Sequence, residues 1–179
     1  MSRLLVKREG LVSSRRMALV DYFLKIEGIS GESADSKHKG EIELESFSWG
    51  ETVEIASSGT GSGASAGKVQ MQDLHFVSRI NKASPKLMLA CASGKHLKEA
   101  ILTARKAGKA AQEFLVIKLR DVLVSSYQTG GSHESDALPL EQVAFNFAQI
   151  EFEYRPQKAD GSLDAPVRAG WDKLVNKAI

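Results

Sequence analysis

The chain has 179 residues, of which 42% are hydrophobic and four are prolines, so it is long enough to bury a sizeable core as one domain. Its formal net charge is +2, but residues 1–16 hold five of the 24 basic residues and one of the 22 acidic ones. The remainder balances 19 basic against 21 acidic residues, which gives no electrostatic reason to expect nucleic-acid binding. The single cysteine, Cys91, excludes an intrachain disulfide.

Residues 1–16 carry positive charges without the long apolar run of a secretory signal, because the apolar residues 4–6 are followed at once by charged residues 7–9. We expect this segment to be a disordered leader or an extension from an upstream start, ahead of a single domain at 17–179. No later segment has the length needed to span a bilayer, so we also expect no stable association with membranes.

Six segments rich in β-branched and aromatic residues are predicted as strands: 19–27, 41–55, 69–80, 97–107, 113–127 and 140–154. The second changes phase midway, since Ile42 and Leu44 share one face while Phe47 and Trp49 alternate onto the other, which makes Ser46 the expected bulge. The last two segments show the same change of phase. Strands bent in this way predict a small, mostly β fold, a barrel of two packed antiparallel sheets.

One helix is predicted at 84–92, where Ser84 can cap the start, Pro85 suits the first helical position and Gly94 can end the helix. Its apolar face should pack against the barrel and consists of Leu87, Met88 and Cys91. A second short helix is weakly indicated at 170–177.

The loop at 57–66 contains only glycine, serine, threonine and alanine. A phosphate-binding loop ending at Lys68 would need glycine in place of Ser62 and a hydroxyl residue in place of Val69, and a strand is expected to follow it where such a site needs a helix. We therefore expect a long protruding loop without a nucleotide, ordered only by a neighbouring molecule. A second polar loop is expected at 128–138.

No candidate catalytic or metal site emerges. Four histidines stand singly, without a partner at metal-ligand spacing: His38, His75, His96 and His133. His75 should point away from the core, and the other three have the charged neighbours typical of surface residues. Cys91 should be a small buried hydrophobe, and the carboxylates of Glu41, Glu43 and Glu45 should form a solvated strand face. We expect a protein that is not an enzyme and needs no cofactor.

Short sequence motifs follow one another along the chain at 47–50, 57–76, 84–96, 122–126, 146–149, 154–161 and 170–171. Together they closely resemble the haemolysin-coregulated protein family, whose rings stack into the inner tube of the bacterial type VI secretion machine. The resemblance implies a β-barrel subunit with one short helix, six copies of which close into a ring around a wide channel.

The resemblance also implies where the ring makes contacts. The loop that reaches the adjacent ring would consist of Ser57, Ser58, Gly59, Thr60, Gly61, Ser62, Gly63, Ala64, Ser65 and Ala66. The family pattern places Ser48 on the channel side, and strand alternation puts Glu43 and Glu45 on the same face. These three residues are the candidate contacts of the lumen with cargo.

The implied function is that of a structural and secreted tube subunit, propelled by sheath contraction and carrying small effectors in its lumen. Its partners would be copies of itself, the spike protein, the contractile sheath, the baseplate and the effectors. It would reside in the cytoplasm before firing and then leave the cell without a signal peptide. Two alternatives remain open: a monomeric barrel that binds a small ligand, and a secreted family member that acts as a toxin.

Overall fold

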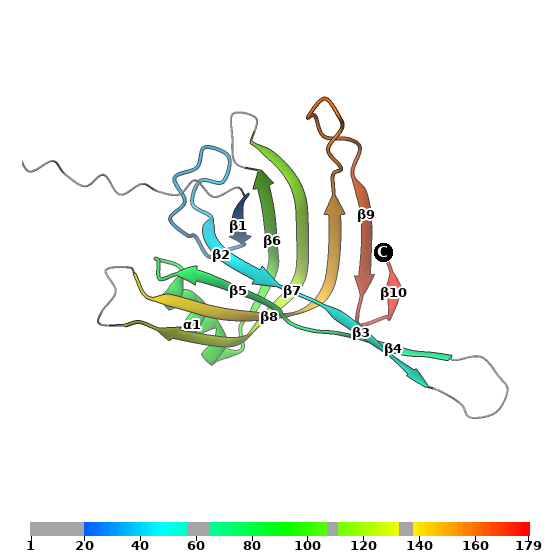
Figure 1. Cartoon of the computed structure of the whole chain (residues 1–179). Coiled ribbons are helices and arrows are strands. Elements are labelled where there is room, and N and C mark those ends of the chain that lie inside the picture. Colours follow the sequence, from blue (N-terminus) through cyan, green and yellow to red (C-terminus); the bar gives the residue numbers. More distant parts are fainter. Residues whose placement is uncertain (1–19, 57–64, 107–110, 133–137) are drawn as a thin grey trace, which may run out of the picture.

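The computed structural model describes residues 20–56, 65–106, 111–132 and 138–179. It is mostly β structure with one helix, as predicted (Figure 1). The elements of the described residues are, in chain order, β1 (Val20–Ile26), β2 (Ile42–Ser48), β3 (Glu51–Ala56), β4 (Ser65–Met71), β5 (Leu74–Arg79), α1 (Ser84–Ser93), β6 (His96–Lys106), β7 (Gln112–Gly130), β8 (Leu140–Tyr154), β9 (Val167–Asp172) and β10 (Lys177–Ala178).

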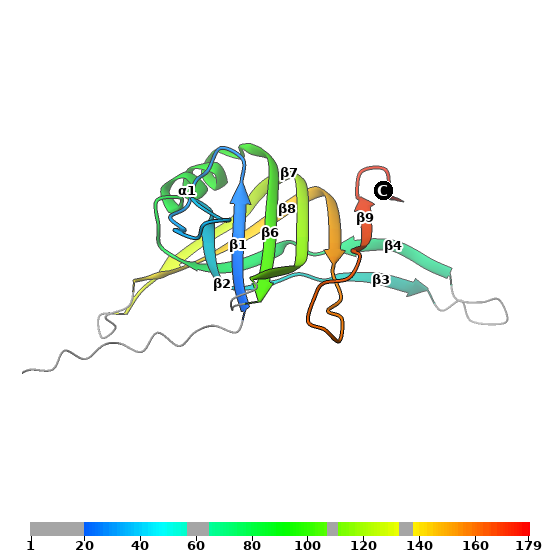
Figure 2. The ribbon, with the colours of Figure 1, turned by 90° about the horizontal axis from the view of Figure 1, so that it is seen from above.

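Six antiparallel strands close into a barrel, in the order β1, β2, β5, β8, β7, β6 and back to β1. Closure depends on β8, whose residues 140–145 pair with β5 while the whole strand pairs with β7. Residues 149–154 of β8 continue past the β5 pairing and take β9 as their neighbour instead. The sheet formed by β6, β7 and β8 therefore extends beyond the barrel through β9 and β10 (Figures 1 and 2).

The barrel interior is filled by large apolar side chains. The most deeply buried include Leu24, Ile42, Leu74, Phe76, Leu102, Ile117, Leu119, Val122, Phe145 and Phe147. The rings of Phe76 and Phe145 meet edge to face with centroids 5.1 Å apart, and Leu87 of α1 joins the same core. Each such side chain contributes roughly 1.5–3 kcal/mol by its burial, so the interior is a packed core.

The predicted changes of strand phase are present, and they arise in two ways. In β2 the register with β5 shifts between Leu44 and Ser46, which confirms the bulge expected there. In β7 and β8 the pairs on either side of Asp121 keep their register, and Asp121 has a φ of 50°. Both strands bend together at this level, so in β7 Ile117 and Leu119 before the bend and Val122 and Val124 after it are all buried.

The two longest strands expected before the helix are each broken in two. The segment predicted at 41–55 forms β2 and β3. The segment predicted at 69–80 forms the last residues of β4 and the whole of β5. The strands β3 and β4 pair only with each other among the described residues. They form a separate two-stranded arm that projects from the barrel (Figure 1).

The helix α1 is confirmed, with two corrections. Its N-cap is Ala83, and the Ser84 hydroxyl instead accepts a hydrogen bond from the Asn81 N–H at 3.0 Å. The buried face consists of Ser84, Leu87 and Ala90. Met88 is exposed and Cys91 only half-buried, because the helix rests on the barrel one residue out of phase with the predicted face.

The second predicted helix, at 170–177, is wrong. The segment contains the end of β9, a turn and the start of β10. The Asp172 carboxylate accepts hydrogen bonds from the N–H groups of Leu174 and Val175, which fixes the turn. A Cβ on Gly170 would lie 2.8 Å from a side-chain carbon of Ile179, so a larger residue there would force the Ile179 side chain to shift. In the described part of the chain, no helix is long and apolar enough to cross a membrane.

An ion-pair cluster ties β9 to β8 on the outer face of the extended sheet. The Glu153 carboxylate lies 2.6 Å from Nε of Arg168 on β9 and 2.7 Å from Nη2 of Arg155. These guanidinium groups, Arg168 foremost, hold the pKa of Glu153 below its usual value. The carboxylate therefore stabilises the folded state fully above the ordinary glutamate pKa, and this contribution is lost as the pH falls through the lowered pKa.

Replacing Glu153 with Gln should lower the free energy of unfolding at neutral pH by about 1–2 kcal/mol, because both arginines lose a charged acceptor. The difference from wild type should shrink toward zero as the pH falls below about 4. Urea denaturation at a series of pH values measures it. The matched control is Glu151→Gln, on the same face of β8, whose more exposed pair with Arg120 should contribute less. A Glu153→Gln deficit that stays constant down to pH 3 would contradict this account.

Candidate assembly surfaces

The arm presents unpaired strand edges. Its pairs run from Glu51 with Met71 at the barrel end to Ala56 with Ser65 at the far end. Neither β3 nor β4 pairs with another strand among the described residues. Free N–H and C=O groups along such edges readily pair with another chain, so the arm is a candidate contact with a neighbouring molecule.

The predicted stacking loop at 57–66 connects the two strands of this arm in the sequence. Residues 57–64 are outside the described part of the chain, so that portion stays a prediction. Ser65 and Ala66 belong to β4 and pair with Ala56 and Ile55, which corrects the predicted end of the loop by two residues. These two residues are part of a strand because β4 pairs with β3, a pairing that the sequence alone did not identify.

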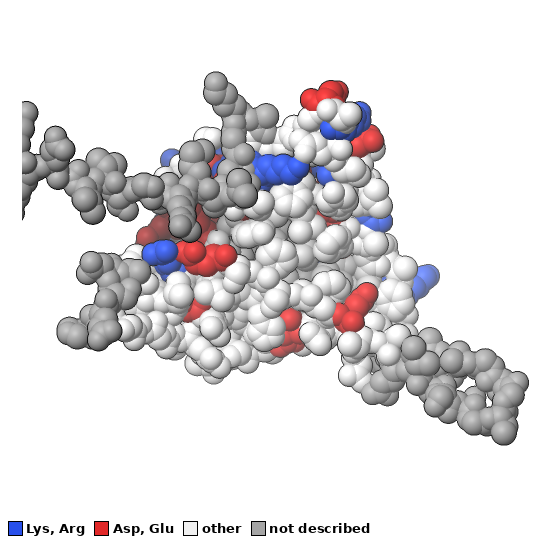
Figure 3. All heavy atoms as spheres, in the orientation of Figure 1, with Lys and Arg blue, Asp and Glu red and all other residues white. Residues whose placement is uncertain are grey.

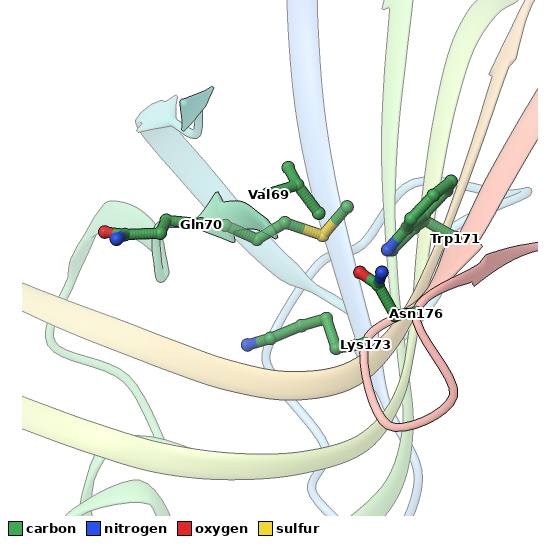
Figure 4. A pocket seen from close by; sticks show the side chains of 6 residues that line it. Val69, Gln70, Trp171, Lys173 and Asn176 are labelled. Carbon is green, nitrogen blue, oxygen red and sulfur yellow. The ribbon is translucent and has the colours of Figure 1, made fainter. Parts of the chain in front are cut away.

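An apolar groove of about 480 Å³ lies between the base of the arm and the extended sheet. It is lined by Trp49, Glu51, Val69, Met71, Ile150, Phe152, Ala169, Gly170 and Trp171. A hollow beside it lies between Val69 and Gln70 of β4 on one side and Trp171 and Asn176 on the other (Figure 4). The groove exists because residues 149–154 of β8 have left the barrel and have no second sheet packed over them.

The apolar surface continues along the extended sheet beyond the groove. Phe152 is 38% exposed and Tyr154 46%, and across the β8–β9 ladder Val167 is 64% exposed. The two tryptophans of the chain, Trp49 and Trp171, both line the groove. Their indole N–H groups are buried without a hydrogen-bond partner among the described residues. An exposed apolar surface of this kind is typical of an interaction site.

Sequence reasoning missed this surface. Ile150, Phe152 and Tyr154 alternate as core residues do, and only the first is buried. No local sequence signal marks where β8 leaves the barrel, because the exit point depends on where its partner strand β5 ends. The face of the molecule shown in Figure 3 is mostly uncharged, with acidic and basic side chains in small separate groups.

The three candidate lumen residues lie on the outer face of the barrel. Ser48 is exposed and pairs across the β2–β5 ladder with His75, which also points outward as predicted. The Glu43 carboxylate accepts a hydrogen bond from the Ser33 hydroxyl at 2.9 Å, and the Glu45 carboxylate lies 2.6 Å from Nε of Arg79. The structure thus brings the three onto one polar face opposite the core, with both carboxylates engaged by neighbours.

The expectation of a surface position is wrong for His38. This residue is 5% exposed, and its ring stacks on Phe23 with centroids 4.1 Å apart. Its Nδ1 lies 2.9 Å from Glu41, so that carboxylate is turned into the protein and is not part of a solvated face. The charged neighbours misled the prediction because the segment 30–41 folds back over the outer face of β1.

Arg105 fixes the same segment over β1. Its guanidinium group lies 4.7 Å from the centre of the Phe23 ring and pairs with Asp21 at 3.0 Å and Asp35 at 2.8 Å. His96 is exposed, as expected, and His133 lies outside the described residues. Where the structure describes the chain, no three His, Cys, Asp or Glu side chains gather as they would to hold a metal ion.

Comparison with known proteins places these features in one family. The model of the family described as "Type VI secretion system effector, Hcp" matches residues 23–154. Protein hcp1 of Pseudomonas aeruginosa is 50% identical over 159 residues, covering 88% of this chain and 97% of that protein.

Solved structures of similar proteins also point to this family. A structure described as a type six secretion system protein has a TM-score of 0.85 at 30% identity, covering 89% of this chain and 99% of that one. Hcp1 from Salmonella typhimurium has a TM-score of 0.72 at 36% identity, covering 90% and 100%. The family match, the sequence identity over nearly the whole chain and the shared barrel agree with one another, and the chain belongs to the Hcp family of the type VI secretion system.

Proposed function

We propose that this chain is the structural and secreted subunit of a type VI secretion inner tube. Six copies close into a ring, rings stack into a hollow tube, and contraction of a surrounding sheath drives the tube out with small effectors in its lumen. The observation that carries this proposal is the open apolar surface on one side of a barrel whose own core is complete. Such a surface has no use in a solitary molecule and is suited to burial against another subunit.

The side-to-side contact in the ring would use the groove between the arm and the extended sheet. This surface lies on the side of the molecule that carries β9 and the arm, and the β7–β8 hairpin lies on the opposite side (Figure 1). The two sides are unlike, so copies that bind through them make a heterologous contact, which closes into a ring when the rotation between subunits allows it. Burial of Phe152, Tyr154 and Val167 would supply the main driving force.

The contact between rings would use the arm and the loop that it carries. The arm extends away from the barrel, so a loop at its end can reach a molecule that the barrel cannot touch. The three glycines of this loop allow close approach to a neighbouring backbone at low steric cost. The cost of ordering such a loop keeps each contact weak, which suits a tube that must be built, fired and dispersed.

The lumen would be lined by the polar face that carries Glu43, Glu45 and Ser48. Both carboxylates are engaged by neighbouring side chains, so this face would offer mainly hydrogen-bonding groups to a cargo. The proposed action is therefore mechanical. The spike protein, sheath and baseplate would be the other partners, and the protein would reside in the cytoplasm until firing carries it out of the cell.

The rival reading, a monomeric barrel that holds a small ligand inside, is disfavoured by the packing. The apolar side chains of the buried core are at most 8% exposed, and the groove lies outside the closed strands. A secreted toxin of the same family is the other alternative, and an activity in the absence of a ring would be its signature.

Replacing Phe152 with Arg should weaken ring formation by roughly 30-fold or more, because central interface residues typically contribute about 2 kcal/mol or more. Size-exclusion chromatography with light scattering should give six times the subunit mass of 19.4 kDa for wild type and a lower mass for the variant. Tryptophan emission should shift to the blue as wild type associates, since both tryptophans line the groove. The control is Leu89→Arg, at an exposed apolar residue of α1. A wild-type protein that stays monomeric at every concentration would defeat the proposal.

Deleting residues 58–64 should leave rings intact and abolish their stacking, because the arm would no longer reach the next ring. Electron microscopy of purified rings at high concentration shows whether tubes form. Deleting residues 133–137, which connect β7 to β8 in the sequence, is the matched control and should spare the tubes. Tubes formed by the 58–64 deletion would exclude this loop from stacking.

Replacing Ser48 with Tyr should spare rings and reduce the amount of effector that copurifies with them by roughly tenfold or more, because a close-packed contact does not accommodate an added ring. Quantitative mass spectrometry of material purified through the ring provides the measurement. Ser162→Tyr, at an exposed serine far from β2, is the control. Unchanged effector recovery with Ser48→Tyr would remove this face from the proposed lumen.

A further inference from the structure

The arm joins the barrel at a break in the strand ladder. The last pair of β2 and β5 is Ser48 with His75, and the first pair of β3 and β4 is Glu51 with Met71. Two residues separate these pairs on the side of β2 and β3, and three residues separate them on the side of β4 and β5. Regular pairing therefore cannot continue through the joint. A backbone hydrogen bond from the Gln72 N–H to the Gly50 carbonyl, at 3.0 Å, spans the gap. Such a joint acts as a hinge unless side chains fix it.

Asp73 lies in this break, two residues after the end of β4. Its Oδ2 accepts a hydrogen bond from the Ser125 hydroxyl of β7 at 2.5 Å, and its Oδ1 accepts one from the Asn146 amide of β8 at 2.7 Å. Both are short, as hydrogen bonds to an ionised acceptor are. One carboxylate therefore ties the arm's base to the two longest strands of the barrel.

The placement of Ser125 depends on an irregularity in β7. The register of β7 and β8 shifts between Val124 and Ser126, which leaves Ser125 as the extra residue of a bulge. A bulge re-aims the side chain that it carries, and here the hydroxyl is directed at Asp73. Apolar contacts of Trp49 and Met71 with the edge of the core also hold the base of the arm, but such contacts are non-directional.

We infer that the carboxylate of Asp73, held by Ser125 and Asn146, is a positioning group that sets the direction of the arm and so the reach of the loop at its end. Neither oxygen of Asp73 is paired with a cation among the described residues, and its two partners are neutral side chains, so the cluster does not serve as an ion pair. The effect of Asp73 on ring stacking rests on the proposed function, whereas its effect on the direction of the arm does not.

The arm direction can be measured without any assembly assay. Spin labels on cysteines introduced at Thr52 of β3 and Lys98 of β6, in a Cys91→Ser background, report the distance between arm and barrel by pulsed electron paramagnetic resonance. Labelled subunits are diluted into unlabelled protein so that only distances within one chain are read. We expect a narrow distribution with Asp73 present and a broad or displaced one in Asp73→Ala. Asn146→Ala, which removes one of the two donors, should give an intermediate result.

Glu99→Ala is the matched control, because it removes an exposed carboxylate that pairs with Arg120 far from the arm. It should leave the distance distribution unchanged. Ring stacking, measured by sedimentation, should fall about tenfold in Asp73→Ala, since a freely moving arm must be ordered at each contact. Melting temperatures recorded for every variant separate loss of arm direction from loss of stability.

Distances in Asp73→Ala and Asn146→Ala that match wild type would overturn the inference, whatever the rings do. A broadened distribution together with normal stacking would overturn the link from arm direction to stacking and would leave the tube proposal intact. Wild-type rings that never stack, combined with a broadened distribution in Asp73→Ala, would defeat the stacking proposal and support the role of Asp73 in the arm.

Discussion

The pairing of β7 with β8 is the constraint on which the rest of the structure depends. These two strands stay in register through a shared bend at Asp121 and remain paired from Leu115 with Tyr154 to Gly130 with Leu140. Their first and second halves therefore belong to different parts of the molecule. One part closes the barrel with β5, and the other continues outward to β9.

Strands that run past the closed barrel account for both exposed surfaces. Closing the barrel removes the strand edges that an open sheet would present. The edges reappear where strands outrun the barrel, at the arm of β3 and β4 and at the extension through β9 and β10. The apolar residues Phe152 and Tyr154 are exposed for the same reason, because the strand that carries them continues after its covering layer has ended. The extension through β9 and β10 thus arises from the length of β8, whereas the arm continues the strands β2 and β5 beyond the barrel.

The polar groups of the molecule are used mainly to hold segments in place. Arg105 and His38 enclose Phe23 and fasten the segment 30–41, Glu153 fastens β9 to β8, and Asp73 fastens the arm to the barrel. Each of these groups is committed to neighbours within the described chain. This arrangement holds the segment 30–41, β9 and the arm in defined positions against the barrel.

The sequence by itself determined the elements that depend on local patterns. Alternation located the strands and the bulge near Ser46, Pro85 and Gly94 located the helix, and the ordered motifs identified the family, because each of these signals lies within a few neighbouring residues. What only the tertiary structure decided depends on contacts between distant segments. The break that separates the arm from the barrel, the burial of His38, the exposure of Phe152 and the meeting of Asp73 with Ser125 and Asn146 all depend on which strand lies opposite, and no local pattern encodes that. The turn at Asp172 replaced a predicted helix for the same reason: β10 folds back and pairs with β9, a contact between segments that the local pattern does not show.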